Sequence, residues 1–253
     1  MNTIFVVTHL APPHRLPPAY SYIHVGSNQF EADYDDSSGE SISNLNPHFC
    51  ELTALYWVWK NYSSPPDSIV GLGHYRRLLV GDSIFSILFK RPLSIDVAKI
   101  ALEKHDLILP RRVPIFSGVY KHYEESHQVK DLHMMVEVLE SVHGVSAQLA
   151  IAHLKDQKWA YLFNMFICKK ELLDRYCAWA FPVLFEIHKR LDYSAKSKYQ
   201  ARAVGFLAER LFNIWLWQNP RLRIKELPVS RLDKSGFSNL NAHRKDIYGA
   251  RPV

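Results

Sequence analysis

The sequence predicts an α/β fold in a single domain, with a mixed, mostly parallel sheet flanked by helices. Short β-branched and apolar runs alternate with amphipathic stretches of helical length along the chain. The 253 residues are 47% hydrophobic, which supplies enough apolar surface for one large core. Because no internal repeat or long linker divides the sequence, we expect one folded unit.

The N-terminal part predicts two strands before the first helix. Residues 3–8 form a β-branched apolar run typical of a buried strand, and residues 22–25 form a second, shorter one. Residues 11–18 hold four prolines and are expected to be loop, because proline cannot donate a ladder hydrogen bond. An acidic loop rich in Ser and Gly is expected over residues 33–43.

The rest of the chain continues this alternation. Further strands are expected over residues 67–72, 106–109 and 161–168, and helices over residues 46–59, 95–104, 122–142, 170–190 and 198–218. The segment after Pro220 contains turn formers, and we expect it to be irregular.

Charge and cysteine content limit the class of protein. The net charge is +6, and residues 220–253 hold eight basic residues against three acidic ones. This excess favours anionic ligands such as diphosphates or lipid headgroups, or it is ordinary solubilising charge. We expect no nucleic-acid partner, because no recognisable DNA- or RNA-binding motif accompanies it. The three cysteines show no paired framework, and no apolar run is long enough to span a membrane, so we expect a cytoplasmic protein with reduced thiols.

Five motifs within residues 3–220 stand out together. They are Ser41-Ile42-Ser43-x-x-Asn46, the run from Cys50 to Asn61, Gly71-x-x-His74-Tyr75-Arg76-Arg77, Asn164-Met165-Phe166-Ile167 and Glu209-Arg210-Leu211-Phe212-Asn213. This combination resembles a bacterial family of capsular and exopolysaccharide biosynthesis proteins long labelled a domain of unknown function.

The resemblance implies a glycosyltransferase with a Rossmann-like GT-A domain over residues 1–220. A basic C-terminal extension, residues 221–253, would pack on or near the same domain. The implied donor is a UDP-sugar, with galactofuranose or another hexose as candidates. The implied acceptor is a lipid-linked oligosaccharide in capsule, exopolysaccharide or O-antigen synthesis, which would bring the protein to the inner face of the plasma membrane. A non-catalytic carbohydrate- or nucleotide-binding module of a polysaccharide assembly complex is the alternative.

The segment from His74 to Arg77 is the first candidate for the donor site. His74, Tyr75, Arg76 and Arg77 follow a predicted strand, and open α/β sheets bind ligands at the carboxyl ends of their strands. Arginine binds phosphate oxygens bidentately and stays charged, so Arg76 or Arg77 could neutralise a leaving diphosphate directly. Structural ion pairs and a buried, hydrogen-bonded His74 are the alternative.

Many GT-A enzymes carry a metal-binding Asp-x-Asp motif after a strand of this kind, but here His74 to Arg77 occupy that position. The sequence contains Asp33-Tyr34-Asp35, but this motif follows the second predicted strand instead. We therefore predict that no metal or other cofactor is required, with a divalent metal at these aspartates as the alternative.

Further candidates for donor contacts follow from their positions. Thr8 and His9 end the first strand, where they could contact uridine or simply cap the strand. Asn44 and Asn46 could contact the donor or cap the helix that begins near Pro47. Asn164 interrupts an apolar strand, and because an unpaired buried amide is costly we expect it to find a partner.

Three residues are candidates for proton transfer. His127 and Asp131 are one helical turn apart, so a carboxylate could orient an imidazole on one helix face. Glu209 on the last predicted helix is the second candidate, because GT-A enzymes often carry their base on such a helix. Surface salt bridges are the alternative for all three residues.

Overall fold

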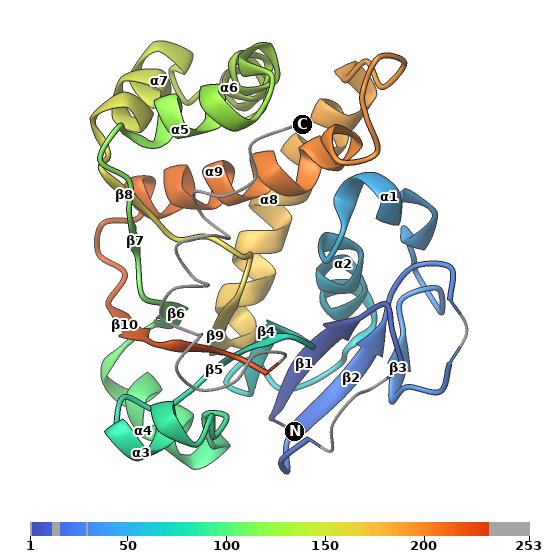
Figure 1. The fold of residues 1–253 in the computed structure, drawn as a ribbon, viewed down its shortest axis with the longest axis vertical. Coiled ribbons are helices and arrows are strands. Elements are labelled where there is room, and N and C mark those ends of the chain that lie inside the picture. Colours follow the sequence, from blue (N-terminus) through green and yellow to red (C-terminus); the bar gives the residue numbers. More distant parts are fainter. Residues whose placement is uncertain (1, 12–15, 29, 233–253) are drawn as a thin grey trace.

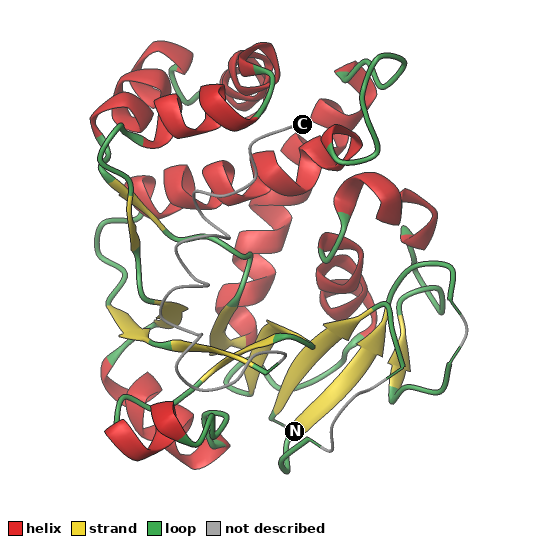
Figure 2. Ribbon diagram, in the orientation of Figure 1, coloured by secondary structure: helices red, strands yellow, loops and turns green. Residues whose placement is uncertain are grey.

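A computed structural model describes residues 2–11, 16–28 and 30–232 of the chain. It confirms the predicted α/β class, with a central sheet between helices (Figures 1 and 2). The elements in chain order are β1 (Thr3–Thr8), β2 (Tyr20–His24), β3 (Tyr34–Asp35), η1 (Ser43–Leu45), α1 (Asn46–Phe49), α2 (Leu52–Asn61), β4 (Ile69–His74), β5 (Arg77–Leu79), α3 (Ile84–Leu88), α4 (Ile95–Lys104), β6 (Leu107–Pro110), β7 (Val113–Pro114), α5 (Val119–Ser126), α6 (Val129–His143), α7 (Ala147–Asp156), β8 (Trp159–Ala160), β9 (Phe166–Lys169), α8 (Lys170–Arg190), η2 (Gln200–Arg202), α9 (Ala203–Gln218), β10 (Ile224–Leu227) and β11 (Val229–Arg231).

The main path of the sheet runs in the order β10-β6-β9-β4-β1-β2-β3. Among these seven strands β9 alone is antiparallel to its neighbours, β4 and β6. Strand β5 turns back from β4 and pairs with β11 in antiparallel fashion. The order β3-β2-β1-β4 reverses direction between β1 and β4, and open α/β sheets bind ligands at such a reversal.

The sheet separates two hydrophobic cores. Along β1, Phe5 and Val7 belong to the core shared with α2, α6, α8 and α9. The alternate residues Ile4 and Val6 belong to the second core, which α4 covers. Every residue of β1 is buried, as expected of a central strand covered on both faces.

The helix predicted over residues 46–59 is interrupted at Cys50. This residue has a φ of 52°, which ends α1 before α2 begins. Asn46 stabilises the break, because its Nδ2 donates to the Cys50 carbonyl at 2.9 Å and to Thr53 Oγ1 at 3.1 Å. Asn46 is therefore not the helix cap, a position that Leu45 occupies. The break turns the start of α2 toward the end of the sheet.

The strand predicted over residues 161–168 begins later than expected. Phe163 and Asn164 have left-handed φ values of 80° and 48°, and β9 starts only at Phe166. Asn213 of α9 takes the place of a strand partner, since its amide accepts from the Tyr161 N–H at 3.0 Å and donates to the Tyr161 carbonyl at 2.8 Å. The residues before β9 consequently form a turn.

The helical region predicted around His127 consists of two helices, α5 and α6, separated by extended backbone. The His127 Nδ1 lies 3.3 Å from Gln200 Oε1, and its ring stacks on Phe206. Asp131 instead accepts a hydrogen bond from Lys196 at 2.5 Å. The predicted His127–Asp131 pair is wrong, because the helix break removes the one-turn spacing on which it depended.

The segment after Pro220 is partly regular, contrary to expectation. Residues 224–227 form β10 beside β6, and residues 229–231 form β11 beside β5. Helices α3 and α7 are further elements that the sequence pattern did not predict. The boundary expected at residue 220 falls between α9 and β10, and residues 233–253 lie outside the described residues. Within the described part of the chain, none of the helices is both long and apolar enough to cross a bilayer.

The close packing of β4 against β9 gives a first prediction. A Cβ at Gly71 would lie 2.7 Å from Ile167 Cγ1 and 3.0 Å from the Phe166 carbonyl oxygen. Gly71→Ala should therefore lower the free energy of unfolding by about 2 kcal/mol. Gly205→Ala in α9 is the control, since its Cβ would meet Cys50 at ordinary contact distance and alanine favours a helix. Urea unfolding of both variants and of the wild type measures the difference. A Gly71→Ala variant as stable as the wild type would contradict the close packing of β4 against β9.

The buried imidazole of His127 gives a second prediction. Burial lowers its pKa from 6.5 to about 3, so the folded protein binds a proton there more weakly than the unfolded chain does. The stability that results is present above pH 6.5 and is lost as the pH falls toward the folded value. His127→Phe keeps a ring to stack on Phe206 and removes the titration. Between pH 7 and pH 5, wild type should lose about 2 kcal/mol more unfolding free energy than the variant. Parallel losses in urea unfolding at both pH values would refute this.

Candidate functional site

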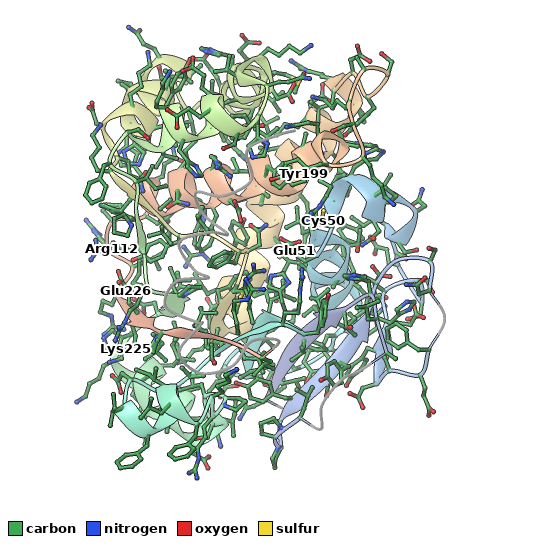
Figure 3. The ribbon with its side chains drawn as sticks, viewed as in Figure 1. Cys50, Glu51, Arg112, Tyr199, Lys225 and Glu226 are labelled. Carbon is green, nitrogen blue, oxygen red and sulfur yellow. The ribbon has the colours of Figure 1, made fainter. Side chains whose placement is uncertain are left out.

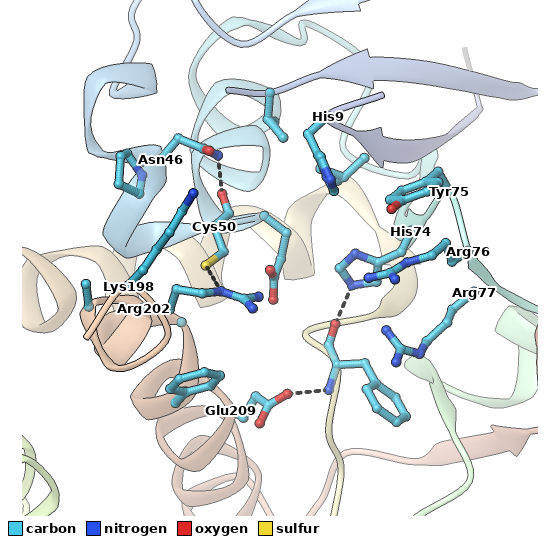
Figure 4. Close-up of a pocket in the computed structure, with 18 residues that line it drawn as sticks. His9, Asn46, Cys50, His74, Tyr75, Arg76, Arg77, Lys198, Arg202 and Glu209 are labelled. Atoms are coloured by element: carbon cyan, nitrogen blue, oxygen red, sulfur yellow. Dashed lines mark hydrogen bonds between the residues drawn. The ribbon is translucent and has the colours of Figure 1, made fainter. Parts of the chain in front are cut away.

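A cavity of about 650 Å³ opens at the carboxyl ends of β1 and β4, where the strand order reverses. Val7 and His9 line it from β1 and the residue that follows, and His74 and Tyr75 line it from β4 and its turn. The junction of α1 and α2 forms a second side, and η2 with the start of α9 closes a third (Figure 4). This is the position that ligands occupy in open α/β sheets.

Four cationic side chains line the cavity from two directions. Arg76 comes from the turn between β4 and β5, and Arg77 is the first residue of β5. Lys198 and Arg202 come from the opposite side (Figure 4). Neither Arg76 nor Lys198 forms an ion pair with any acidic residue in the described part of the chain. Arg76 and Lys198 are therefore available to an anionic ligand.

His9 lies within the influence of cations from both sides of the cavity. Burial lowers this pKa, and the charges of Arg76 and Arg202 lower it further. His9 also packs edge-on against Tyr75, with ring centroids 5.3 Å apart. The region around His9 is consequently electropositive and suits the phosphates of a nucleotide.

Two carboxylates, Glu51 and Glu209, also line the cavity. Figure 3 labels Glu51 beside Cys50, at the start of α2, and Figure 4 shows Glu209 on α9 below the arginines. Both oxygens of Glu209 are engaged, because Oε1 accepts from the Phe163 N–H at 2.7 Å and Oε2 pairs with Arg210 at 2.8 Å. Burial raises the pKa of Glu209, and the Arg210 charge opposes this shift.

Glu51 is engaged at one oxygen only. Its Oε1 accepts a hydrogen bond from Asn164 Nδ2 at 2.7 Å, while Oε2 has no hydrogen-bond partner among the described residues. The partner expected for the buried Asn164 amide is thus Glu51, with the Gly205 carbonyl as a weaker second acceptor at 3.4 Å. Glu51 keeps an oxygen free for a ligand in the cavity.

His74 is held in one orientation by the same turn. Its Nε2 donates a hydrogen bond to the Phe163 carbonyl at 2.7 Å. Burial lowers the pKa of His74, so the imidazole is neutral near pH 7. The Phe163 ring in turn lies under the guanidinium of Arg77, 4.9 Å from its carbon.

The cavity brings together most but not all of the residues that the sequence singled out. Those that line it are His9, Asn46, His74, Tyr75, Arg76, Arg77 and Glu209. Thr8 is buried and its hydroxyl donates to the Leu10 carbonyl, so it caps the strand end. Asn44 is exposed on η1, and Asn164 acts through Glu51. Direct contact with a donor is not supported for these three side chains.

The other two candidates for proton transfer lie outside the cavity. His127 stacks on Phe206, with ring centroids 4.2 Å apart, and Phe206 lines the cavity whereas His127 does not. Asp131 forms a buried ion pair with Lys196, whose side chain is 1% exposed. Neither side chain lines the cavity in which a substrate would bind.

Sequence reasoning missed Glu51, Lys198, Arg202 and Phe206. Glu51 lies inside the distinctive run that begins at Cys50, so that motif held a signal for it. Arg202 and Lys198 precede the last helix among other basic residues, and only the fold brings them across from Arg76. Nothing in their local pattern distinguished them from solvated charges.

The side chains present do not fit an Asp-x-Asp metal site. Asp33 accepts from the Tyr22 N–H at 2.7 Å, and Asp35 accepts from Ser37 and lies 3.1 Å from His24. Neither aspartate lines the cavity. Among the described residues, no three His, Cys, Asp or Glu side chains gather in an arrangement that could hold a metal ion. The absence of a metal requirement stays a prediction, which chelation can test.

The fold is similar to a known enzyme structure. The apo structure of WbbM, a bifunctional glycosyltransferase, matches with a TM-score of 0.80 and 26% sequence identity. The match covers 92% of this chain and 45% of the WbbM chain, so this chain spans less than half the length of that protein. The similarity fits a GT-A-like domain. No curated protein matches the chain.

A family model extends over most of the sequence. The model, described as a domain of unknown function and designated DUF4422, matches residues 3–220. The matched region includes the residues that line the cavity, from Val7 to Glu209. By this match, the chain belongs to the DUF4422 family.

Proposed function

We propose that this protein is a glycosyltransferase that transfers a hexose from a nucleotide-diphosphate sugar to a glycan acceptor. The observation that carries the proposal is the pairing of a cationic wall with two carboxylates in one cavity at the reversal of the strand order. The cations can bind the diphosphate of the donor. The carboxylates can stabilise the positive charge that develops on the sugar as the diphosphate leaves. The similarity to a bifunctional glycosyltransferase supports the same reaction class.

The donor diphosphate binds between Arg76 and Arg202 in this proposal. Both guanidinium groups lower the pKa of His9, so a dianion placed between them is attracted from two sides. Positive charge at this place stabilises the diphosphate as it leaves the sugar. The donor is a UDP-sugar, with galactofuranose or another hexose as the sugar, as the family resemblance implies.

The free oxygen of Glu51 faces the sugar in this proposal. As the diphosphate departs, positive charge develops on the sugar ring, and a nearby carboxylate stabilises it whether the reaction inverts or retains configuration. Asn164 orients Glu51 through a hydrogen bond of 2.7 Å. Glu209 acts as a positioning residue, because both of its oxygens hold the Phe163 turn and Arg210.

The acceptor is a lipid-linked oligosaccharide in synthesis of a bacterial surface polysaccharide, and no metal takes part. Incubation of the purified protein with UDP-sugars and a polyprenyl-linked oligosaccharide, with and without EDTA, tests these points together. Donor binding without transfer or hydrolysis would favour a non-catalytic binding module. Transfer that stops in EDTA and returns with Mn²⁺ would overturn the metal-free mechanism.

Loss of one cavity arginine should weaken donor binding. Arg76→Ala or Arg202→Ala removes a charge-assisted contact worth about 2 kcal/mol, so the dissociation constant of UDP should rise about thirtyfold. Titration calorimetry measures the change. Arg112→Ala is the matched control, since Arg112 pairs with Glu226 outside the cavity. If UDP affinity is unchanged in Arg76→Ala and Arg202→Ala, the diphosphate does not bind between these two arginines.

The two carboxylates should respond differently to isosteric substitution. Glu51→Gln should lower kcat about a hundredfold or more while UDP affinity stays within about twofold. Glu209→Gln should instead lower the melting temperature, because the buried Arg210 loses its charged partner. Glu103→Gln on the exposed face of α4 is the control for both. Full turnover in Glu51→Gln would show that the Glu51 carboxylate does not stabilise the charge on the sugar.

A further inference from the structure

Large apolar side chains gather outside the cores on α3 and the residue that follows it. Ile84, Phe85, Leu88 and Phe89 are 63%, 67%, 55% and 65% exposed. Their spacing places all four on one face of the short helix, and the rings of Phe85 and Phe89 lie parallel with centroids 6.4 Å apart. Elsewhere in the described residues, exposed side chains of this size stand alone or in pairs on a helix face. We call these four residues, with Lys90 and Arg91, the α3 tip.

The backbone holds the α3 tip away from the cores. The segment leaves and returns at one point, where Val80 bridges Pro92 in antiparallel fashion. Ser83 caps the helix by accepting from the Ser86 N–H, and the Arg91 N–H donates to the Ser86 carbonyl at 3.0 Å. The apolar side chains are therefore presented outward by an ordered loop.

Two cations border this apolar face directly. Lys90 and Arg91 follow Phe89, and neither forms an ion pair with an acidic residue in the described part of the chain. Arg91 lies over the Phe89 ring with its guanidinium carbon 5.9 Å from the centroid. On the next helix Val97 and Ile100 are also exposed, at 50% and 63%. Apolar and aromatic side chains bordered by cations are typical of surfaces that enter an anionic lipid interface.

We propose that the α3 tip inserts into the interface of a membrane that contains anionic phospholipids. Phe85 and Phe89 enter the boundary between headgroups and acyl chains, while Lys90 and Arg91 bind headgroup phosphates. The charge of these two cations favours anionic lipid over a second copy of this chain, whose tip would carry the same positive charge. Helices α3 and α4 lie at one edge of the molecule, away from α1 and α9 beside the cavity (Figure 1), so lipid contact leaves the cavity accessible. This inference does not depend on the proposed reaction.

Vesicle co-sedimentation tests the proposal with the whole protein. Wild type should bind vesicles of phosphatidylcholine mixed with phosphatidylglycerol and should bind pure phosphatidylcholine more weakly. Phe85→Ser with Phe89→Ser should reduce binding to the mixed vesicles about tenfold or more. Lys90→Gln with Arg91→Gln should abolish the preference for the anionic lipid. Phe116→Ser is the matched control, because Phe116 is 83% exposed and lies outside the α3 tip.

Two sedimentation results would overturn the proposal. Wild-type protein that stays in the supernatant with the mixed vesicles overturns it, as does equal binding by the Phe85→Ser, Phe89→Ser variant. Light scattering in the absence of lipid checks the competing occupant. A dimer that this double variant converts to a monomer would assign the surface to a second copy of the chain and would overturn the lipid assignment.

Discussion

The left-handed turn at Phe163 and Asn164 is the constraint on which the cavity depends. Its backbone accepts from His74 and donates to Glu209, and the Asn164 side chain holds Glu51. A bulky residue at a φ of 80° costs roughly 1–3 kcal/mol, so these contacts must stabilise the turn. Strand β4, helix α2 and helix α9 are thereby fixed relative to one another at a single point.

This arrangement fixes two carboxylates inside a cavity that cations also line. The turn and its partners occupy both oxygens of Glu209 and one of Glu51. Arg76 and Arg202 come from the β4–β5 connection and η2, whereas Arg77 begins β5 and its guanidinium lies over the Phe163 ring of the turn. A ligand with an anionic end and a sugar end therefore meets cations and carboxylates whose positions are set before it binds.

The sequence predicts those helices and strands whose conformation is determined by the pattern of their own residues. Strand β1 and helix α8 have the predicted bounds, because a continuous β-branched run and a long amphipathic pattern need no information from elsewhere. The breaks at Cys50 and Phe163 depend on side chains distant in sequence, such as Asn213 bonding Tyr161. Strands β10 and β11 carry several polar residues, and pairing with β6 and β5 determines their conformation.

The same distinction applies to the cavity. His74 to Arg77 could be placed from the sequence, because they follow a strand whose carboxyl end must lie at the edge of the sheet. The separate roles of Glu51 and Glu209 could not, since they depend on which oxygens other elements occupy. The expected His127–Asp131 pair failed for a related reason: a helix break changes which residues share a face.

The antiparallel strand β9 has a consequence for the order in which the sheet is completed. It joins β4 to β6, yet it is made after all the strands from β1 to β8. Until residues 166–169 leave the ribosome, Ile69 to Leu72 of β4 present an apolar edge with unpaired backbone groups. A truncated chain that ends at α7 therefore leaves β6 without either of its partner strands, and the β4 edge is open to aggregation.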